Sequence, residues 1–252
     1  MTRMTMRRLA LAGFLAATMA STASAAALEE LRATLQTLRA AGPLTARLTM
    51  ETSGQFQDQG EERTRAGSAS VVAEDRGPGK AIALVYEDRV LTEAARQPAG
   101  RRDARGPIDA LRGLDAFEAL GLMRPADEWL TDLEGARLIA ERAETRAGAS
   151  VRALDLALKA PRGMDQEKGL KVERTATVWI ADSGHPVGAR VKTHTEFKRF
   201  IFKVTFDVTE TTDYGLVAGR LLARRQDSQN RWKAWIVAEG SNSSVTTVEP
   251  LE

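Results

Sequence analysis

The chain contains no cysteine, and this absence removes several kinds of chemistry. Without thiols there is no cysteine nucleophile, no thiolate metal site and no disulfide, so stability must come from packing and backbone pairing. The two histidines, His185 and His194, are too few for a histidine-rich metal centre. We therefore expect no metal site and no cofactor.

Aromatic residues make up only 5% of the chain, which disfavours the aromatic-lined cleft of enzymes that bind polymers. The sequence also lacks a Gly-x-Ser-x-Gly elbow, and Gly77-Pro78-Gly79 has no following Lys-Ser/Thr that would make it a phosphate-binding loop. No two acidic residues stand out as a general acid and base. The sequence therefore predicts no enzyme and names no catalytic residue.

No apolar run is long enough to cross a bilayer, which takes about 20 residues. The mostly apolar run from Leu9 to Ala20 follows Arg3, Arg7 and Arg8 and precedes Ala23-Ser24-Ala25. This order is that of a secretory signal cleaved near Ala25. The alternative is an amphipathic first helix, but the run has no polar face. We expect export to the periplasm, by general secretion or, given the twin arginine, by the folded-state route.

Charge and the missing cysteine limit what the exported product can bind. A lipid-anchored lipoprotein needs a cysteine after the cleavage site, so we expect a product that is not membrane-anchored. The whole chain has 36 basic and 34 acidic residues, and without the three arginines of the signal 33 basic residues remain. A nearly neutral protein of this kind is not expected to bind nucleic acid.

After the signal, the sequence opens with a predicted helix. Leu28, Leu31, Leu35 and Leu38 recur at spacings of three and four, which places them on one helical face. Gly42-Pro43 then ends the helix. We expect this leucine face to cover a sheet.

From Leu44 onward the apolar period changes from 3.6 to 2, which indicates strands. The polar stretch Ser53–Gly67 predicts a long turn. The remaining predicted strands are Ser68–Glu74, Lys80–Glu87, Arg137–Arg146, Ser150–Lys159, Lys171–Ala181, Val187–Glu196, Phe200–Thr211, Leu216–Arg225 and Arg231–Glu239. Short links such as Asp227–Asn230 imply an antiparallel meander, and Gly240–Ser244 predicts a terminal polar loop.

The middle of the chain interrupts the strand pattern. Residues 94–106 are rich in Arg and Gly, which favours a solvated loop over an anion site. A helical insert follows at about residues 107–133, where Pro107 and Pro125 each begin a helix. The predicted fold is mainly β with α: an antiparallel half-barrel sheet covered by an N-terminal helix and this central helical insert. Residues 26–252 are expected to form one such domain.

Two predicted strands carry strongly apolar faces, one in Phe200–Val208 and one in Ser150–Lys159. Under the helices these faces enclose either a filled core or a hydrophobic cavity, and the sequence leaves both open. The candidate cavity residues are Leu48, Met50, Leu154, Leu156, Leu158, Phe200, Phe202 and Phe206. The candidate helical cover is Leu31, Leu35, Leu38, Leu111, Leu114 and Phe117.

Two segments resemble the periplasmic lipoprotein carriers of the Lol type and their lipid-binding relatives. Gly67–Pro78 is similar to that superfamily's strand that begins with Gly and ends in Arg-Pro, although Gly77 separates Arg76 from Pro78 here. Val178–Pro186 is similar to its tryptophan-containing strand and Gly/Pro hairpin. The resemblance implies a half-barrel plugged by helices, with Arg76 as the residue that holds the lid.

The first hypothesis for function is therefore a periplasmic carrier or binder of lipids or lipid-modified proteins that buries acyl chains in the half-barrel. Its expected partner is a lipid or an acyl-modified protein, with a membrane protein as a further partner. The alternatives are a protein-interaction or sensor module on the same fold, and a hydrolase whose site the sequence does not reveal.

Overall fold

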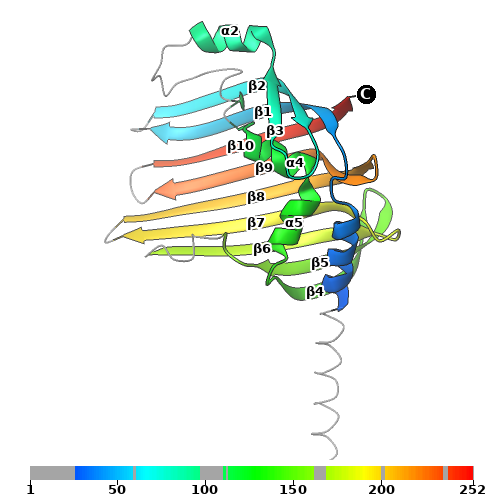
Figure 1. The fold of residues 1–252 in the computed structure, drawn as a ribbon. Coiled ribbons are helices and arrows are strands. Elements are labelled where there is room, and N and C mark those ends of the chain that lie inside the picture. Colours follow the sequence, from blue (N-terminus) through cyan, green and yellow to red (C-terminus); the bar gives the residue numbers. More distant parts are fainter. Residues whose placement is uncertain are drawn as a thin grey trace, which may run out of the picture.

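The computed structural model describes residues 26–58, 61–96, 110–111, 113–161, 169–199, 202–234 and 238–251. The predicted signal in residues 1–25 and the Arg-rich stretch after residue 96 lie outside these described residues. Strands dominate, and the helices are few and short (Figure 1).

The described residues begin with a helix over 26–37, called the N-terminal helix below. The further helices whose full bounds the structure describes are α2 (Asp88–Arg96), α4 (Ala116–Met123) and α5 (Pro125–Asp132). The strands are β1 (Leu44–Asp58), β2 (Glu61–Asp75), β3 (Ile82–Tyr86), β4 (Arg137–Arg146), β5 (Ala149–Leu158), β6 (Leu170–Ala181), β7 (Pro186–Arg199), β8 (Phe202–Val217), β9 (Arg220–Ala234) and β10 (Ala238–Leu251).

All ten strands form one antiparallel sheet in the order β3-β2-β1-β10-β9-β8-β7-β6-β5-β4. Neighbours in the sheet are consecutive in the chain except β1 and β10, which pair from Thr45 opposite Leu251 to Phe56 opposite Gly240. The predicted meander is confirmed, and the β1–β10 pairing joins its two halves. The sheet stays open between β3 and β4.

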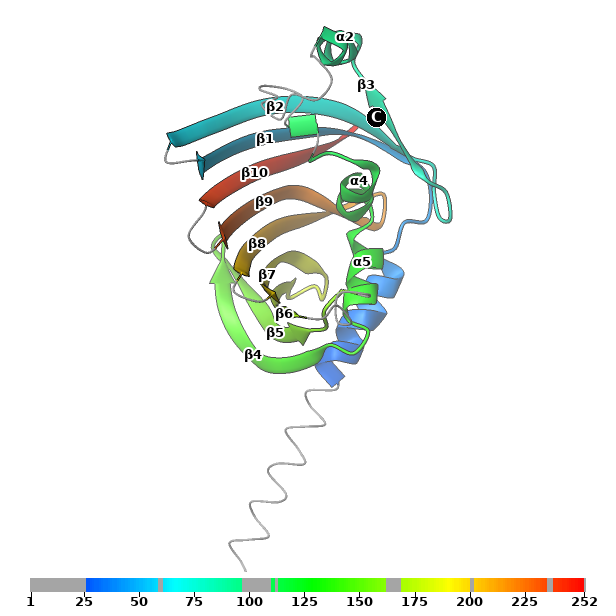
Figure 2. The same cartoon turned by 90° about the vertical axis from the view of Figure 1, so that its left-hand side faces the viewer.

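The sheet curves around the helices to form a half-barrel (Figure 2). Helices α4 and α5 cross its inner side near one end of the strands, with the N-terminal helix beside α5 (Figures 1 and 2). The predicted fold, a half-barrel covered by an N-terminal helix and central helices, is confirmed. Helix α2 stands apart, beyond β2.

Three predicted breaks in the sheet are wrong. Most of the predicted turn Ser53–Gly67 is paired strand, with Ser53 opposite Ala66 in β2. Asp227–Asn230 lies inside β9, and Gly240–Ser244 lies inside β10. These segments lack apolar alternation because both of their faces are polar, yet pairing to strands on either side satisfies the backbone. The predicted strand Leu216–Arg225 is broken instead at residues 218 and 219, whose φ angles of 49° and 76° form a tight turn.

The core lies between the helices and the inner face, in two apolar clusters. The first joins the leucine face of the N-terminal helix and Trp129 of α5 to Leu154, Leu156 and apolar neighbours on β6. The second joins Leu122 and Met123 of α4 to the inner residues of β1, β2 and β9. The helical cover is therefore held mainly by burial of apolar area, worth about 25 cal/mol per Å².

A buried ion network pins the junction of α4 and α5 to the sheet. Asp75, at the end of β2, accepts hydrogen bonds from Nε of Arg124 at 3.1 Å and from Nη1 of Arg220 at 2.7 Å. All three residues are at most 9% exposed. Arg124 also donates to the carbonyl oxygens of Gly77 and Lys80, and Arg220 to that of Gly42.

The network sets the charge state of Asp75. Burial by itself would raise the pKa of this carboxyl, but hydrogen bonds from Arg124, from the Gly77 N–H and from Arg220 lower it below its usual value. A lowered pKa stabilises the fold above the ordinary carboxyl range, and this stability is lost as the pH falls through the native pKa.

We predict that Asp75→Asn lowers the free energy of unfolding by about 3–5 kcal/mol at pH 7, because it leaves two buried guanidinium groups without a carboxylate. Urea denaturation followed by circular dichroism measures this. The control is Glu74→Gln, which removes the neighbouring exposed ion pair with Arg76 and should change stability by less than about 0.5 kcal/mol. Equal effects of the two variants would contradict a pinning role for Asp75.

Candidate functional site

The helices leave part of the inner face uncovered, and a hollow of about 660 Å³ lies there. We call it the inner hollow. Its walls come from β1, β2, β8, β9, β10 and α4. The residues that line it are Met50, Thr52, Ser53, Gly54, Gln55, Arg65, Gly113, Glu118, Glu210, Ser228, Asn230, Trp232, Ser241, Asn242, Ser243 and Ser244.

Strand register gives the floor of this hollow a polar band. Thr52 lies opposite Ser244, which lies opposite Ser228, which lies opposite Glu210, so one row of polar residues crosses four strands. The next row joins Gly54, Asn242 and Asn230. Hydroxyl and amide groups both donate and accept hydrogen bonds, so this band offers both to a ligand.

Apolar residues flank the polar band on both sides along the strands. Toward the helices, Met50 is 4% exposed and belongs to the buried cluster under α4. Toward the other strand ends, Trp232 lies opposite Phe206, whose exposed fraction is 39%. The inner face is thus apolar under the helices, polar in the hollow and aromatic at its outer end.

The indole ring of Trp232 packs against the backbone of β10 at Gly240. A Cβ atom at Gly240, its cross-strand partner, would lie 2.8 Å from the indole Nε1 and 2.9 Å from two ring carbons. Only glycine therefore allows the indole this position. The ring lines the inner hollow from there.

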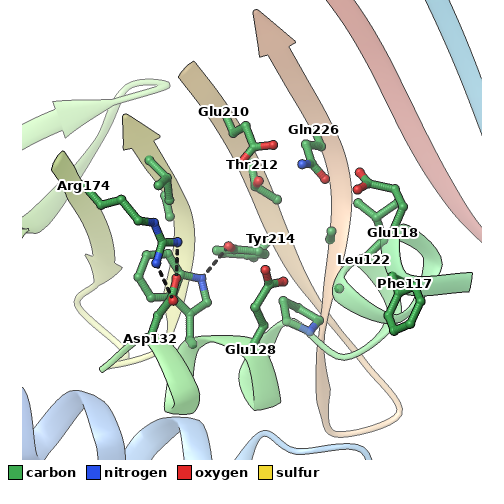
Figure 3. A pocket seen from close by; sticks show the side chains of 16 residues that line it. Phe117, Glu118, Leu122, Glu128, Asp132, Arg174, Glu210, Thr212, Tyr214 and Gln226 are labelled. Atoms are coloured by element: carbon green, nitrogen blue, oxygen red, sulfur yellow. Dashed lines mark hydrogen bonds and ion pairs between the residues drawn. The ribbon is translucent and has the colours of Figure 1, made fainter. Parts of the chain in front are cut away.

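A smaller pocket of about 120 Å³ adjoins the hollow between α4, α5 and the sheet (Figure 3). It shares Glu118 and Glu210 with the inner hollow. Both guanidinium Nη atoms of Arg174 bind Asp132 at 2.8 Å, and the Trp129 indole donates to the Tyr214 hydroxyl at 2.7 Å. We call this the acidic pocket.

The acidic pocket raises the pKa values of its carboxyl groups. Burial, then the charges of Glu210, Glu128 and Asp115, raises the pKa of Glu118 to about 7. Loss of surrounding water raises the pKa of Glu128 and of Glu210, with Asp132 adding to both and Arg174 opposing both. Burial also raises the pKa of Tyr214. The three glutamates therefore stay protonated to higher pH than ordinary carboxyl groups do. Among the described residues, no three or more His, Cys, Asp or Glu are placed to hold a metal ion.

The residues predicted to line a cavity fall into three groups. Leu48, Met50, Leu154, Leu156 and Leu158 are buried in the two apolar clusters. Phe206 is partly exposed beside Trp232. Phe200 and the side chain of Phe202 lie outside what the structure describes. Among those whose side chains the structure describes, only Met50 lines the inner hollow.

The predicted cover residues also differ in exposure. Leu31, Leu35 and Leu114 are buried, and Leu38 and Leu111 are half-buried. Phe117, in contrast, is 83% exposed at the start of α4. Sequence periodicity could not find this difference, because it places Phe117 on the same apolar face as its neighbours.

The lid-holding role proposed for Arg76 stays a prediction. Its side chain is exposed and lies 3.5 Å from Glu74. The structure places Arg124 in contact with Asp75 instead, one residue before Arg76 in the chain. The sequence pattern thus pointed to the correct strand end, while the buried network centres on the neighbouring carboxylate.

Comparisons with known proteins give no family. No family model matches the chain, and no curated protein sequence matches it. Within the described residues, none of the helices has the length and apolar character needed to cross a membrane.

A few solved structures align with most of this chain, but their sequence identities and TM-scores are low. A DUF1329 family protein from Desulfovibrio piger is 14% identical, with 88% of this chain and 90% of that chain covered and a TM-score of 0.27. The ywiB protein from Bacillus subtilis is 5% identical, with 84% and 96% covered and a TM-score of 0.20. MucB, solved in complex with MucA(peri), is 11% identical, with 89% and 93% covered and a TM-score of 0.19. Similarities of this size support no statement about function.

We predict that Glu118→Gln removes a pH dependence of stability. A carboxyl whose native pKa is raised destabilises the fold as the pH rises from its ordinary value of 4.5 to about 7. The variant should therefore match the parent near pH 4 and exceed it by on the order of 1–3 kcal/mol at pH 8. Urea denaturation at both pH values measures this, with the exposed Glu239→Gln as control. An equal gain at both pH values would contradict the prediction.

Proposed function

We propose that this chain is an exported, periplasmic carrier or binder of lipids or lipid-modified proteins, which buries acyl chains against the inner face of the half-barrel. The proposal includes a signal in residues 1–25, cleavage near Ala25 and a single domain from residue 26 onward. One observation carries it. Met50 lines the open inner hollow and also packs in the buried cluster under α4, so the hollow adjoins the apolar core directly.

The volume and the energetics suit an amphiphile. Pockets for small molecules generally measure about 300–1,000 Å³, and the inner hollow falls in this range. Each CH₂ group transferred from water to an apolar site contributes about 0.8 kcal/mol. A chain passing Met50 gains this when α4 moves away from β1. Such a carrier needs a dry surface and a movable cover, and no catalytic group.

Helix α4 has features of a movable cover. Its inner side, with Ala119, Leu122 and Met123, is buried. Phe117, which lines the acidic pocket, is 83% exposed, and Leu120 is 37% exposed. The helix is eight residues long, and the described hydrogen bonds that pin it to the sheet converge on Arg124 at its end. Its start can therefore separate from the sheet while Arg124 stays bound.

The second candidate function is a protein-interaction module for a membrane partner. The exposed Phe117 and Leu120 favour it, since apolar residues on one side of an exposed helix are typical of contact surfaces. Under this function the same residues contact a protein instead of an acyl chain.

Lipid extraction and mass spectrometry of the protein purified from its own host separate the two functions. A carrier should release lipid in near-stoichiometric amounts, and adding that lipid back to the delipidated protein should raise its melting temperature. The absence of lipid, with no shift on addition, would overturn the carrier. Capture of one membrane protein that persists after delipidation would then support the interaction module.

We predict that Phe117→Gln weakens binding of a fluorescent fatty acid to the delipidated protein by about 5- to 30-fold. The lost aromatic contact is worth about 1–2 kcal/mol, and the exposed position leaves folding intact. Fluorescence titration measures the affinity. The control is Leu91→Gln on α2, an exposed apolar residue away from the cover, which should bind as the parent does. Equal affinities of the two variants would contradict this role for Phe117.

A further inference from the structure

The polar floor of the inner hollow has no part in burying an acyl chain. Its side chains are mostly hydroxyl and amide groups. Two adjacent rows of Ser, Thr, Asn and Gly residues cross β1, β10 and β9 under an open volume of about 660 Å³. A site for a bare hydrocarbon would place apolar residues here, because burying hydroxyl and amide groups against a chain leaves their hydrogen bonds unmade. The floor therefore suits the polar part of a ligand.

Charges of both signs line the hollow. Glu118 and Glu210 line it together with Arg65, and both carboxyl groups also border the acidic pocket. Arg65 lies opposite Gly54 in the second polar row, so a charged ligand on the floor meets a group of its own sign whether it is an anion or a cation. A ligand without charge avoids this repulsion.

The hydrogen-bonding groups distinguish a hydroxyl-rich ligand from a cation. Ser228 and Ser244 carry hydroxyls, and Asn230 and Asn242 carry amides, so each can both donate and accept. The Thr52 hydroxyl donates to the carbonyl oxygen of Gly67 at 3.4 Å and can accept from a ligand. A sugar hydroxyl also donates and accepts, so it can use both functions. An ammonium group only donates, and it would leave the donors of the floor without partners.

Asn230 supplies a direct sign of a missing donor. Its Oδ1 atom is buried and has no hydrogen-bond partner among the described residues. A buried acceptor without a partner is costly. Asn230 also lines the hollow, so a turn of its side chain would bring this atom to the open volume, where a ligand hydroxyl could donate to it. Asn230 lies in β9 two residues before Trp232, on the same face of the strand.

Trp232 adds a flat surface at the outer end of the same floor. The indole lies against Gly240, where no other residue would leave room for it. A flat aromatic ring beside hydroxyl and amide groups suits the apolar C–H face of a sugar ring, whose hydroxyls point to its edge. We infer that the inner hollow binds an uncharged, polyhydroxylated sugar group, with Trp232 as the stacking surface and Asn230 as a hydrogen-bond acceptor.

This inference rests on the proposed function, in which the sugar is the head of the amphiphile and its chain passes Met50. The test uses probes that share one chain: n-dodecyl β-D-maltoside, dodecyl sulfate and dodecylamine, each below its micelle concentration, with free maltose as a chainless probe. Isothermal titration calorimetry of the delipidated full chain measures each affinity. We expect the maltoside to bind at least about tenfold more tightly than the two charged probes.

Five variants test the assigned residues. Trp232→Ala and Asn230→Ala should each lower maltoside affinity about tenfold and leave the affinities for the charged probes nearly unchanged. Lys233→Ala, next to Trp232 on the other face, and Gln229→Ala, next to Asn230 on the other face, should keep the preference for maltoside. Trp232→Phe, which keeps a ring, should fall between the parent and Trp232→Ala. Circular dichroism confirms that each variant folds.

The outcomes separate the inference from the proposed function. Equal binding of all three amphiphiles, or a maltoside preference that survives both Trp232→Ala and Asn230→Ala, would overturn the sugar site and leave the carrier. Tighter binding of dodecylamine would replace the sugar with a cation held at Glu118 and Glu210. If no amphiphile binds, the carrier is overturned; maltose binding that depends on Trp232 would then still support the sugar site, and its absence would overturn that too.

Discussion

Asp75 is the residue on which the arrangement of helices and sheet depends. Its carboxylate binds two buried arginines that lie 49 and 145 residues further along the chain, one between α4 and α5 and one at the start of β9. Removing two guanidinium groups and a carboxylate from water costs free energy, and contacts to several backbone carbonyls offset part of this cost. Because these partners come from distant segments, the network forms only when the sheet is assembled and α4 has docked on it. It fixes one end of the cover and leaves the exposed start of α4 less constrained.

Away from the Asp75 network, the polarity of the inner face changes along the strands. Under the helices it is packed apolar core, with Leu48 and Leu156 fully buried. Beyond the helices it becomes a polar floor, and at the outer strand ends it carries Trp232 and Phe206. An amphiphile has the same division into chain and head. This match between the bands of the inner face and the parts of an amphiphile is why a carrier accounts for the molecule better than a rigid structural domain does.

The sequence predicted the covered half of the molecule well and the hollow poorly, for one physical reason. Where one face of an element is buried, apolar residues recur at its period, as in the leucines of the N-terminal helix and in Leu154, Leu156 and Leu158. The strands that floor the hollow face solvent on both sides, so their apolar alternation is lost and Ser53–Gly67 and Gly240–Ser244 read as loops. The pairing of β1 with β10 joins residues about 200 positions apart, and no local pattern reports it. Asp75 likewise looks like an ordinary charge at a strand end until Arg124 and Arg220 are placed beside it.

The central claim is that the start of α4 moves away from the sheet to admit a ligand while the Asp75 network holds. Hydrogen–deuterium exchange of the delipidated and ligand-loaded protein tests this most directly. We expect loading to change amide exchange in α4, residues 116–123, and in β1 near Met50, while exchange at the ends of β2 and β9 around Asp75 and Arg220 stays the same. Unchanged exchange across α4 in protein that has demonstrably bound ligand would contradict this claim.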